Sequence, residues 1–172
     1  NNLLKIIDCN QEFSIHDVGC GIGNLLEYMD ENLKDHHFIY SGSEIVKEFY
    51  DYCREAYPGN KFFLRNIADK SFEDKYDYIV LSGIFHQMRN ISIKDWEEFY
   101  RNLIKNSFQM SKKGIAFNFV TEFVDFYQPG IYYCNINKLI NFINDNLSRF
   151  FVINHSYPLY EFTVFVYKES FI

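Results

Sequence analysis

The stretch at residues 16–24, HDVGCGIGN, decides the fold, because three glycines at alternate positions follow an aspartate and a short apolar-leaning run. Gly19, Gly21 and Gly23 can adopt positive φ and allow a ligand to approach the main chain closely. The amides at the start of a helix beginning near Asn24 favour a carboxylate or a phosphate. The stretch therefore predicts a strand, a loop for an anionic group and a helix.

Short β-rich runs alternate with helical patterns along the rest of the chain, which favours an α/β fold. Only the six residues SYPLYE separate the last two runs, so these should form an antiparallel hairpin. We predict a Rossmann-like, doubly wound, mostly parallel seven-stranded sheet with one antiparallel strand at the C-terminal hairpin. The predicted strands are residues 14–18, 37–41, 61–64, 76–82, 114–120, 150–155 and 162–168.

Three apolar stripes at helical spacing are expected to pack the core. They are Ile45, Phe49, Tyr52 and Ala56; Trp96, Phe99, Tyr100, Leu103, Ile104 and Phe108; and Ile136, Leu139, Ile140, Ile143 and Leu147. The length of 172 residues fits one domain, 1–172. The first residues have the pattern expected in the middle of a helix, so we expect the domain to be truncated at the N-terminus.

Composition narrows the class of partner. The net charge is -6 with no long basic run, which disfavours long nucleic acids as partners. No apolar run has the length of a membrane span. The four cysteines are scattered without metal-binding spacing, as expected for reduced thiols in a cytoplasmic protein, and no metal is expected. The oligomeric state is left open.

The pattern Asp-x-Gly-x-Gly-x-Gly, which begins at Asp17, departs from the dinucleotide fingerprint, since Asn24 stands where that motif requires glycine. It resembles the first motif of the class I methyltransferases that use S-adenosylmethionine. The resemblance implies this cofactor, with S-adenosylhomocysteine as product, and it places Asp17 and the glycine loop at the methionine end.

Later segments extend the resemblance over nearly the whole chain. In YSGSEI, Glu44 stands where the family grips the ribose; in LRNIAD, Asn66 and Ile67 stand where it cradles adenine; YDYIVLSGIFHQM resembles the fourth strand and the loop facing the methyl donor. Aspartate is commoner at positions 44 and 66. The implied cofactor residues are Asp17, Gly19, Cys20, Gly21, Gly23, Asn24, Glu44, Ile45, Asn66, Ile67, Ser82 and Gly83.

Each of these residues also has a purely structural interpretation. Glycines in a strand-to-helix turn can serve tight packing, Glu44 can be a charge at a helix N-terminus, and Asn66 can form a turn. The ordered set at these spacings favours the cofactor site.

His86 follows the fourth strand and is the best-placed candidate for a general base, because its unperturbed pKa near 6.5 suits proton removal at neutral pH. The alternative is a histidine that shapes the pocket. The segment TEFVDFYQPGIYYCN after the fifth strand is expected to wall the acceptor pocket or to pack a long loop. The expected acceptor contacts are Phe85, Tyr127, Tyr132 and Tyr133, with Phe123 and Phe126 nearby.

The expected reaction is methyl transfer to oxygen or nitrogen of a small polar metabolite, such as a sugar derivative or a phosphorylated or amino compound. SGIFH, GIAFNF and EFTVFVYK resemble bacterial methyltransferases associated with surface-glycan and small-metabolite modification. SGIF replaces the Asn/Asp-Pro-Pro-aromatic motif of amino-methylating DNA enzymes. The alternatives are a protein side-chain methyltransferase and a non-catalytic sensor or subunit that binds the cofactor.

Overall fold

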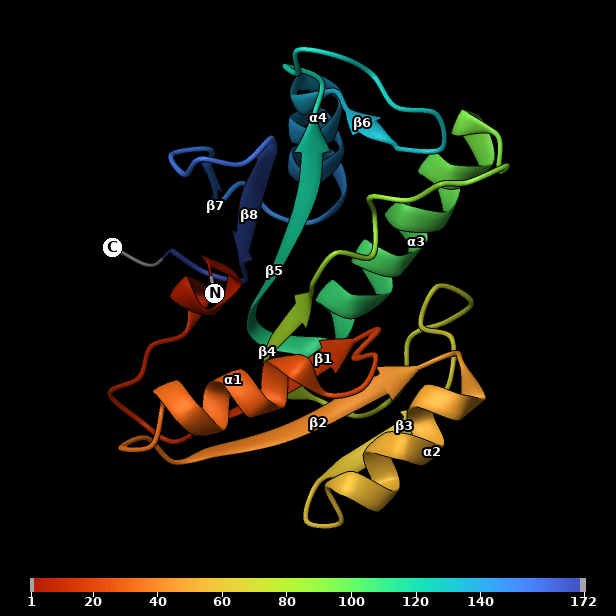
Figure 1. Cartoon of the computed structure of the whole chain (residues 1–172). Coiled ribbons are helices and arrows are strands. Elements are labelled where there is room, and N and C mark those ends of the chain that lie inside the picture. The colour runs from red at the N-terminus through yellow and green to blue at the C-terminus, as the bar shows by residue number, and fades with distance from the viewer. Residues whose placement is uncertain (1, 171–172) are drawn as a thin grey trace.

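In the computed structural model, which describes residues 2–170, the strands of the chain join into one mixed sheet (Figure 1). The predicted runs all form strands, with ends that differ by up to three residues. The strands are β1 (Phe13–Val18), β2 (Phe38–Glu44), β3 (Lys61–Leu64), β4 (Tyr76–Leu81), β5 (Ser111–Thr121), β6 (Tyr133–Cys134), β7 (Phe151–Asn154) and β8 (Glu161–Tyr167).

The strand order β3-β2-β1-β4-β5-β8-β7 confirms the doubly wound topology. The first five strands are mutually parallel, and β8 runs antiparallel to both β5 and β7. The carboxyl ends of β1 and β4 therefore meet where the winding reverses, which is where such sheets bind ligands. The two-residue strand β6 was not predicted; it pairs with the end of β5.

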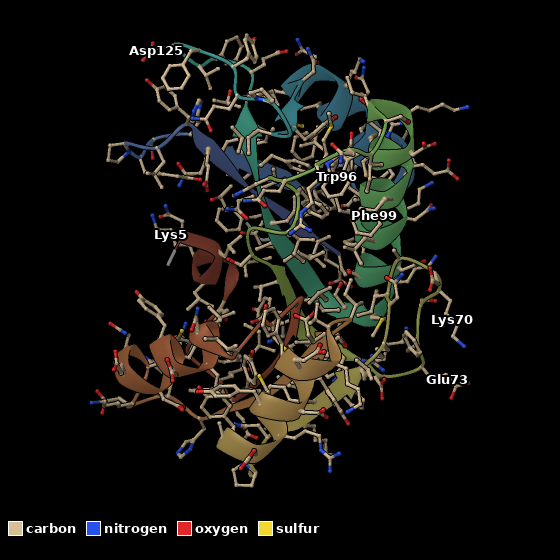
Figure 2. The ribbon with its side chains drawn as sticks, turned by 45° about the vertical axis from the view of Figure 1, so that its right-hand side comes forward. Lys5, Lys70, Glu73, Trp96, Phe99 and Asp125 are labelled. Atoms are coloured by element: carbon tan, nitrogen blue, oxygen red, sulfur yellow. The ribbon has the colours of Figure 1, made fainter. Side chains whose placement is uncertain are left out.

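Helices cover both faces of the sheet (Figure 1). A 3₁₀ helix, η1 (Asn2–Ile6), and the helices α1 (Asn24–Asn32) and α2 (Lys47–Ala56) pack one apolar cluster, and α3 (Ile93–Met110) and α4 (Ile136–Asn146) pack the other. The predicted stripe of α3 is buried except for Phe99, which is half-buried, and in Figure 2 Trp96 and Phe99 lie on the side of α3 that faces the sheet. No helix within residues 2–170 combines the length and apolarity needed to cross a bilayer.

The predicted core stripe of α2 is wrong. Ile45, Phe49 and Tyr52 are 66%, 44% and 48% exposed, and Ala56 is exposed as well. Cys53 is the buried residue of this helix, and Tyr50 and Tyr57 pack beside it. The two sets lie on neighbouring faces of one helix, so periodicity did not distinguish the face that meets the sheet.

The connection from β3 to β4 contains no helix and crosses the sheet over β1 and β2. A cluster of polar side chains around His16 lies on that face of the sheet. The ring of His16 is fully buried, its Nδ1 and Nε2 lie 2.7 Å from the hydroxyls of Ser41 and Ser43, and it stacks on Tyr76. Burial, with Arg65 nearby, lowers the pKa of His16 to about 3, so the ring is neutral. These bonds fix Ser43 at the carboxyl end of β2.

Candidate functional site

The glycine loop after β1 has the backbone that only glycine adopts readily. Gly19, Gly21 and Gly23 have φ of 68°, 56° and 92°. The amide of Gly19 donates to the carbonyl of Ser43 at 2.7 Å, which ties the loop to the end of β2. A Cβ on Gly23 would lie 2.6 Å from the ring of Tyr57. The loop is thereby held against β2 and α2, and α1 starts directly after it.

Asp17 lies beneath this loop with one carboxylate oxygen unpaired. Its Oδ2 accepts a hydrogen bond from the hydroxyl of Tyr40 at 2.9 Å, whereas its buried Oδ1 has no partner in the described residues. Burial raises the pKa of Asp17 to about 7; the bond from Tyr40 opposes this rise and Glu44 adds to it. An unpaired buried carboxylate oxygen fits a cationic ligand group such as an ammonium.

A pocket of about 350 Å³ opens over Asp17 and the loop. Six of the predicted cofactor residues line it: Asp17, Gly19, Cys20, Gly21, Asn24 and Ser82. Ile22, Leu25 and Tyr28 line it as well and were not predicted. The helix α1 begins at this pocket without a side-chain cap, so its first amides remain available to an anion.

Glu44 ends β2 beside the loop and is 7% exposed. Its Oε2 accepts from the amide of Gly21 at 2.9 Å, and its Oε1 accepts from the amides of Ile45 and Val46 at 2.7 and 2.9 Å. A carboxylate has about four acceptor sites. Three of these sites are occupied, so Glu44 can hold the loop and the start of α2 and still accept from one hydroxyl group.

A second, narrow cavity of about 60 Å³ adjoins the first, and the two share Gly19. The predicted residues Glu44, Ile45, Asn66 and Ile67 line it. The Asn66 side chain accepts from the amide of Ala68 and donates to Asp69, both at 3.0 Å. In this structure Asn66 forms a turn, so the predicted contact to an adenine amino group would require the bond to Asn66 Oδ1 to be shared.

Several lining residues of this cavity have no motif that would have revealed them. Phe99 and Leu103 belong to the apolar stripe of α3, where pocket-lining and core positions share one pattern. The guanidinium of Arg65 lies over the rings of Phe63 and Phe72 and donates to the Ser43 hydroxyl at 2.9 Å. Arg65 thus stiffens the wall of the cavity through contacts that distant segments supply.

Some residues of the loop after β4 lie at the site, and others pack into the core. Gly83 has φ of 70° and is exposed, as is Ser82. The side chain of Ile84 lies against Gly19, where a Cβ would approach it to 3.0 Å. Phe85 is fully buried and stacks on Phe119, with 4.7 Å between the ring centroids. The expected acceptor contact of Phe85 is therefore not supported, because its ring packs the core.

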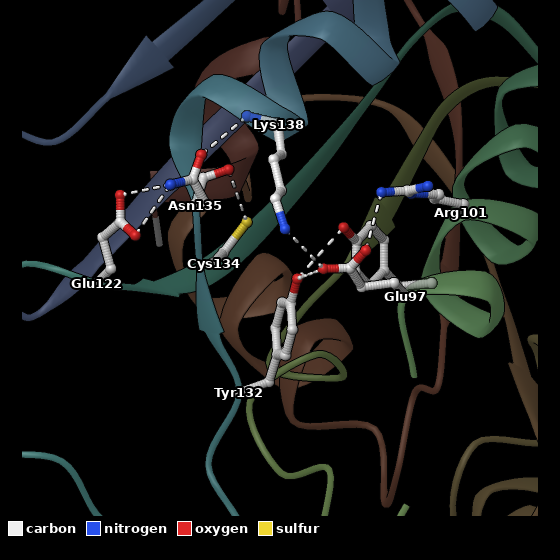
Figure 3. Close-up of polar contacts among 8 residues, drawn as sticks. Glu97, Arg101, Glu122, Tyr132, Cys134, Asn135 and Lys138 are labelled. Carbon is white, nitrogen blue, oxygen red and sulfur yellow. Dashed lines mark hydrogen bonds and ion pairs between the residues drawn. The ribbon is translucent and has the colours of Figure 1, made fainter. Parts of the chain in front are cut away.

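Tyr132 is likewise a core residue. It is 6% exposed, and its hydroxyl donates to Glu97 of α3 at 3.1 Å, as Figure 3 shows. Arg101 and Lys138 also approach Glu97, at 3.0 and 4.0 Å. This cluster joins α3 to α4, so the structure does not support the expected contact of Tyr132 with an acceptor.

The other aromatic residues of the loop after β5 lie at the surface. Phe123, Phe126 and Tyr127 are each about 65% exposed. The rings of Tyr127 and Tyr133 pack edge to face at 4.7 Å, and the Tyr133 hydroxyl accepts from a loop amide. Figure 2 places Asp125 at the outer end of this loop. The loop forms an apolar rim beyond β5 that is held in shape by its own contacts.

His86 is half-buried in the loop after β4. Its Nδ1 lies 3.8 Å from Oε1 of Glu161, and its Nε2 is buried with no partner in the described part of the chain. Burial lowers the pKa of His86, and the Glu161 carboxylate only partly offsets this. The ring is therefore neutral at pH 7. Within residues 2–170, no group of three or more His, Cys, Asp or Glu side chains is arranged to hold a metal ion.

The fold and these two adjoining cavities define a class I methyltransferase dependent on S-adenosylmethionine. A family model described as a methyltransferase domain matches residues 16–106, and the chain belongs to this family. The match begins within β1 and ends within α3, and it includes the glycine loop, Glu44, Asn66 and His86.

One relative and two solved structures are similar to this chain over a longer span. The "Putative methyltransferase Rv1506c" of Mycobacterium tuberculosis is 29% identical over 97% of this chain and 100% of its own length. Magnesium protoporphyrin IX methyltransferase from Synechocystis, solved with bound S-adenosylhomocysteine, superposes with a TM-score of 0.65 at 13% identity over 92% of this chain and 75% of that one. The CurJ carbon methyltransferase superposes at 0.67 and 12% identity, over 97% and 51%.

Proposed function

We propose that this methyltransferase acts on oxygen or nitrogen of a small polar molecule that binds at the carboxyl edge of the sheet, between the loops after β4 and β5. The observation that carries the proposal is the half-buried, neutral His86, whose buried Nε2 has no partner in the described residues. An unpaired buried nitrogen is costly unless a ligand satisfies it. In the complex, a hydroxyl or amine hydrogen of the acceptor supplies that partner, which requires the side chains that cover Nε2 to move aside.

The cofactor is assigned to the two adjoining cavities. The residues of the larger cavity would hold the methionine end: Oδ1 of Asp17 would accept from its ammonium group, and the first amides of α1 would bind its carboxylate. The residues of the smaller cavity would hold the nucleoside end, where Glu44 would accept from a ribose hydroxyl. The bound cofactor supplies an electrophilic methyl group on a sulfonium.

The residues of the chain contribute position and proton acceptance. Holding the acceptor atom in line with the methyl group supplies much of the rate, because the reaction becomes effectively unimolecular. His86 accepts the acceptor's proton as the new bond to the methyl carbon forms. The rim formed by Phe123, Phe126 and Tyr127 supports a molecule that presents an apolar face beside its reacting group.

The experiment is a screen for release of S-adenosylhomocysteine with pools of hydroxylated and amino metabolites. At least one pool should give release, and His86→Ala should reduce kcat for its active compound by about 10²- to 10⁴-fold with cofactor affinity nearly unchanged. His86→Asn should fail equally, because asparagine is no base. Release with protein substrates alone, or near-normal kcat in His86→Asn, would contradict the proposal.

A further inference from the structure

A chain of polar contacts links the loop after β4 to strands β5 and β8. The amide of Gly83 donates to Oδ1 of Asn118 on β5 at 2.8 Å, and Nδ2 of Asn118 donates to Oε2 of Glu161 on β8 at 2.8 Å. The other oxygen of Glu161 faces Nδ1 of His86 at 3.8 Å. In the antiparallel pair, Asn118 is opposite Thr163 and Val120 is opposite Glu161, so Asn118 and Glu161 share one face.

The chemistry of the groups determines which one donates in both hydrogen bonds of this network. A backbone amide can only donate, so the oxygen of Asn118 must face Gly83 and its NH₂ group must face Glu161. An ionised carboxylate can only accept. Glu161 therefore receives a hydrogen from Asn118 through one oxygen and offers its other oxygen to His86.

This arrangement favours one tautomer of His86. Since Glu161 accepts, the favourable neutral ring carries its hydrogen on Nδ1 and its lone pair on Nε2. Nε2 is the buried nitrogen without a partner. The separation of 3.8 Å exceeds a hydrogen bond, and such contacts in ligand-free sites often shorten when the ligand binds.

We infer that Glu161, held by Asn118, is a positioning residue that keeps the hydrogen of His86 on Nδ1, so that Nε2 takes the acceptor's proton. This inference rests on the proposed function. As the bond from the acceptor atom to the methyl carbon forms, the carbon–sulfur bond breaks and its electron pair stays on sulfur. The acceptor's proton moves to Nε2, and the resulting imidazolium lies beside the Glu161 carboxylate.

The loop geometry gives the same network a second effect. Gly83 is three residues before His86, and its neighbour Ser82 lines the larger cavity. The bond from Gly83 to Asn118 thus fixes the backbone that carries His86 relative to the cofactor site. The side chain of Asn118 therefore positions both His86 and Glu161.

Glu161→Gln provides a specific test by NMR, in which long-range ¹H–¹⁵N spectra report which imidazole nitrogen carries hydrogen. The His86→Asn spectrum assigns the signals of His86. In the wild type, Nδ1 should be protonated and Nε2 bare. In Glu161→Gln, Asn118 still donates to the glutamine oxygen, so the glutamine NH₂ group faces Nδ1. The hydrogen of His86 should therefore move to Nε2.

Glu122→Gln is the matched control, because Glu122 also accepts from an asparagine side chain, that of Asn135, at 3.0 Å (Figure 3). It should leave the His86 tautomer unchanged. With an acceptor from the screen, Glu161→Gln should lower kcat by about 10²-fold or more while binding of S-adenosylhomocysteine changes less than twofold. Circular dichroism and the melting temperature check that each variant folds.

A wild-type His86 with hydrogen on Nε2, or an unchanged tautomer in Glu161→Gln, would overturn the inference irrespective of the acceptor. The tautomer shift together with the loss of kcat would support it. If the tautomer shifts as expected but His86→Asn retains near-normal turnover, the base role in the proposed function fails, and with it the catalytic meaning of the network.

Discussion

Glu44→Ala should destabilise the protein and weaken cofactor binding, since the carboxylate holds three backbone amides. Those of Ile45 and Val46 lie at an exposed turn, where water can replace the lost acceptor, whereas the Gly21 amide is half-buried. Hydrogen bonds to charged groups are worth about 1.5–3 kcal/mol each, so we expect a loss of roughly 2–4 kcal/mol. For a chain of this size, this lowers the melting temperature by roughly 5–15 °C.

The assay combines thermal unfolding with calorimetric titration of S-adenosylhomocysteine below the melting temperature of the variant. Loss of the ribose contact should weaken affinity by about tenfold or more. Glu48→Ala is the control, because it removes a charge from the exposed first turn of α2 without touching the loop. A melting temperature of Glu44→Ala within about 2 °C of this control would refute the loop-holding role, and equal affinity would remove Glu44 from the cofactor site.

Three further predictions concern the pocket floor, β2 and metals. Because burial raises the pKa of Asp17 to about 7, its stabilising protonation is lost as pH rises through 7. The ligand-free wild type should therefore lose stability between pH 4 and 8 relative to Asp17→Asn, while its affinity for S-adenosylmethionine rises; parallel pH profiles of the two proteins would contradict this. Gly42→Ala should cost about 1–3 kcal/mol in urea unfolding, because its Cβ would lie 2.7 Å from the Cys20 sulfur, whereas Gly59→Ala, with open space, should cost less than 1 kcal/mol; equal losses would show that Cys20 yields. Methyl transfer should persist in EDTA; abolition by chelation with restoration by magnesium would show that a metal is required.

Sequence patterns predicted the sheet because strands with strong β-propensity alternate with helices, and connection lengths separate a crossover from a hairpin. The limit appears in α2, where apolar residues occupy two neighbouring faces and only packing against β2 and β3 selects the Cys53 face. The strand β6 could not be predicted either, because its two residues are too few to show the alternation of a strand.

At the site, the local motifs predicted backbone features well and side-chain partners poorly. The positive φ of the glycine loop follows from residue type. The burial of Phe85 and Tyr132 depends on Phe119 and Glu97, which come from other elements. The same holds for Asn118 and Glu161, whose pairing requires the register of β5 with β8.

The most direct test of the central claim is calorimetric titration of S-adenosylhomocysteine into the wild-type protein, repeated with a large excess of NAD. The two adjoining cavities, one lined by Asp17 and the glycine loop and the other by Glu44, predict saturable binding at one site per chain that NAD does not weaken. Absence of binding, or loss of binding in the presence of NAD, would contradict the assignment of this groove to S-adenosylmethionine.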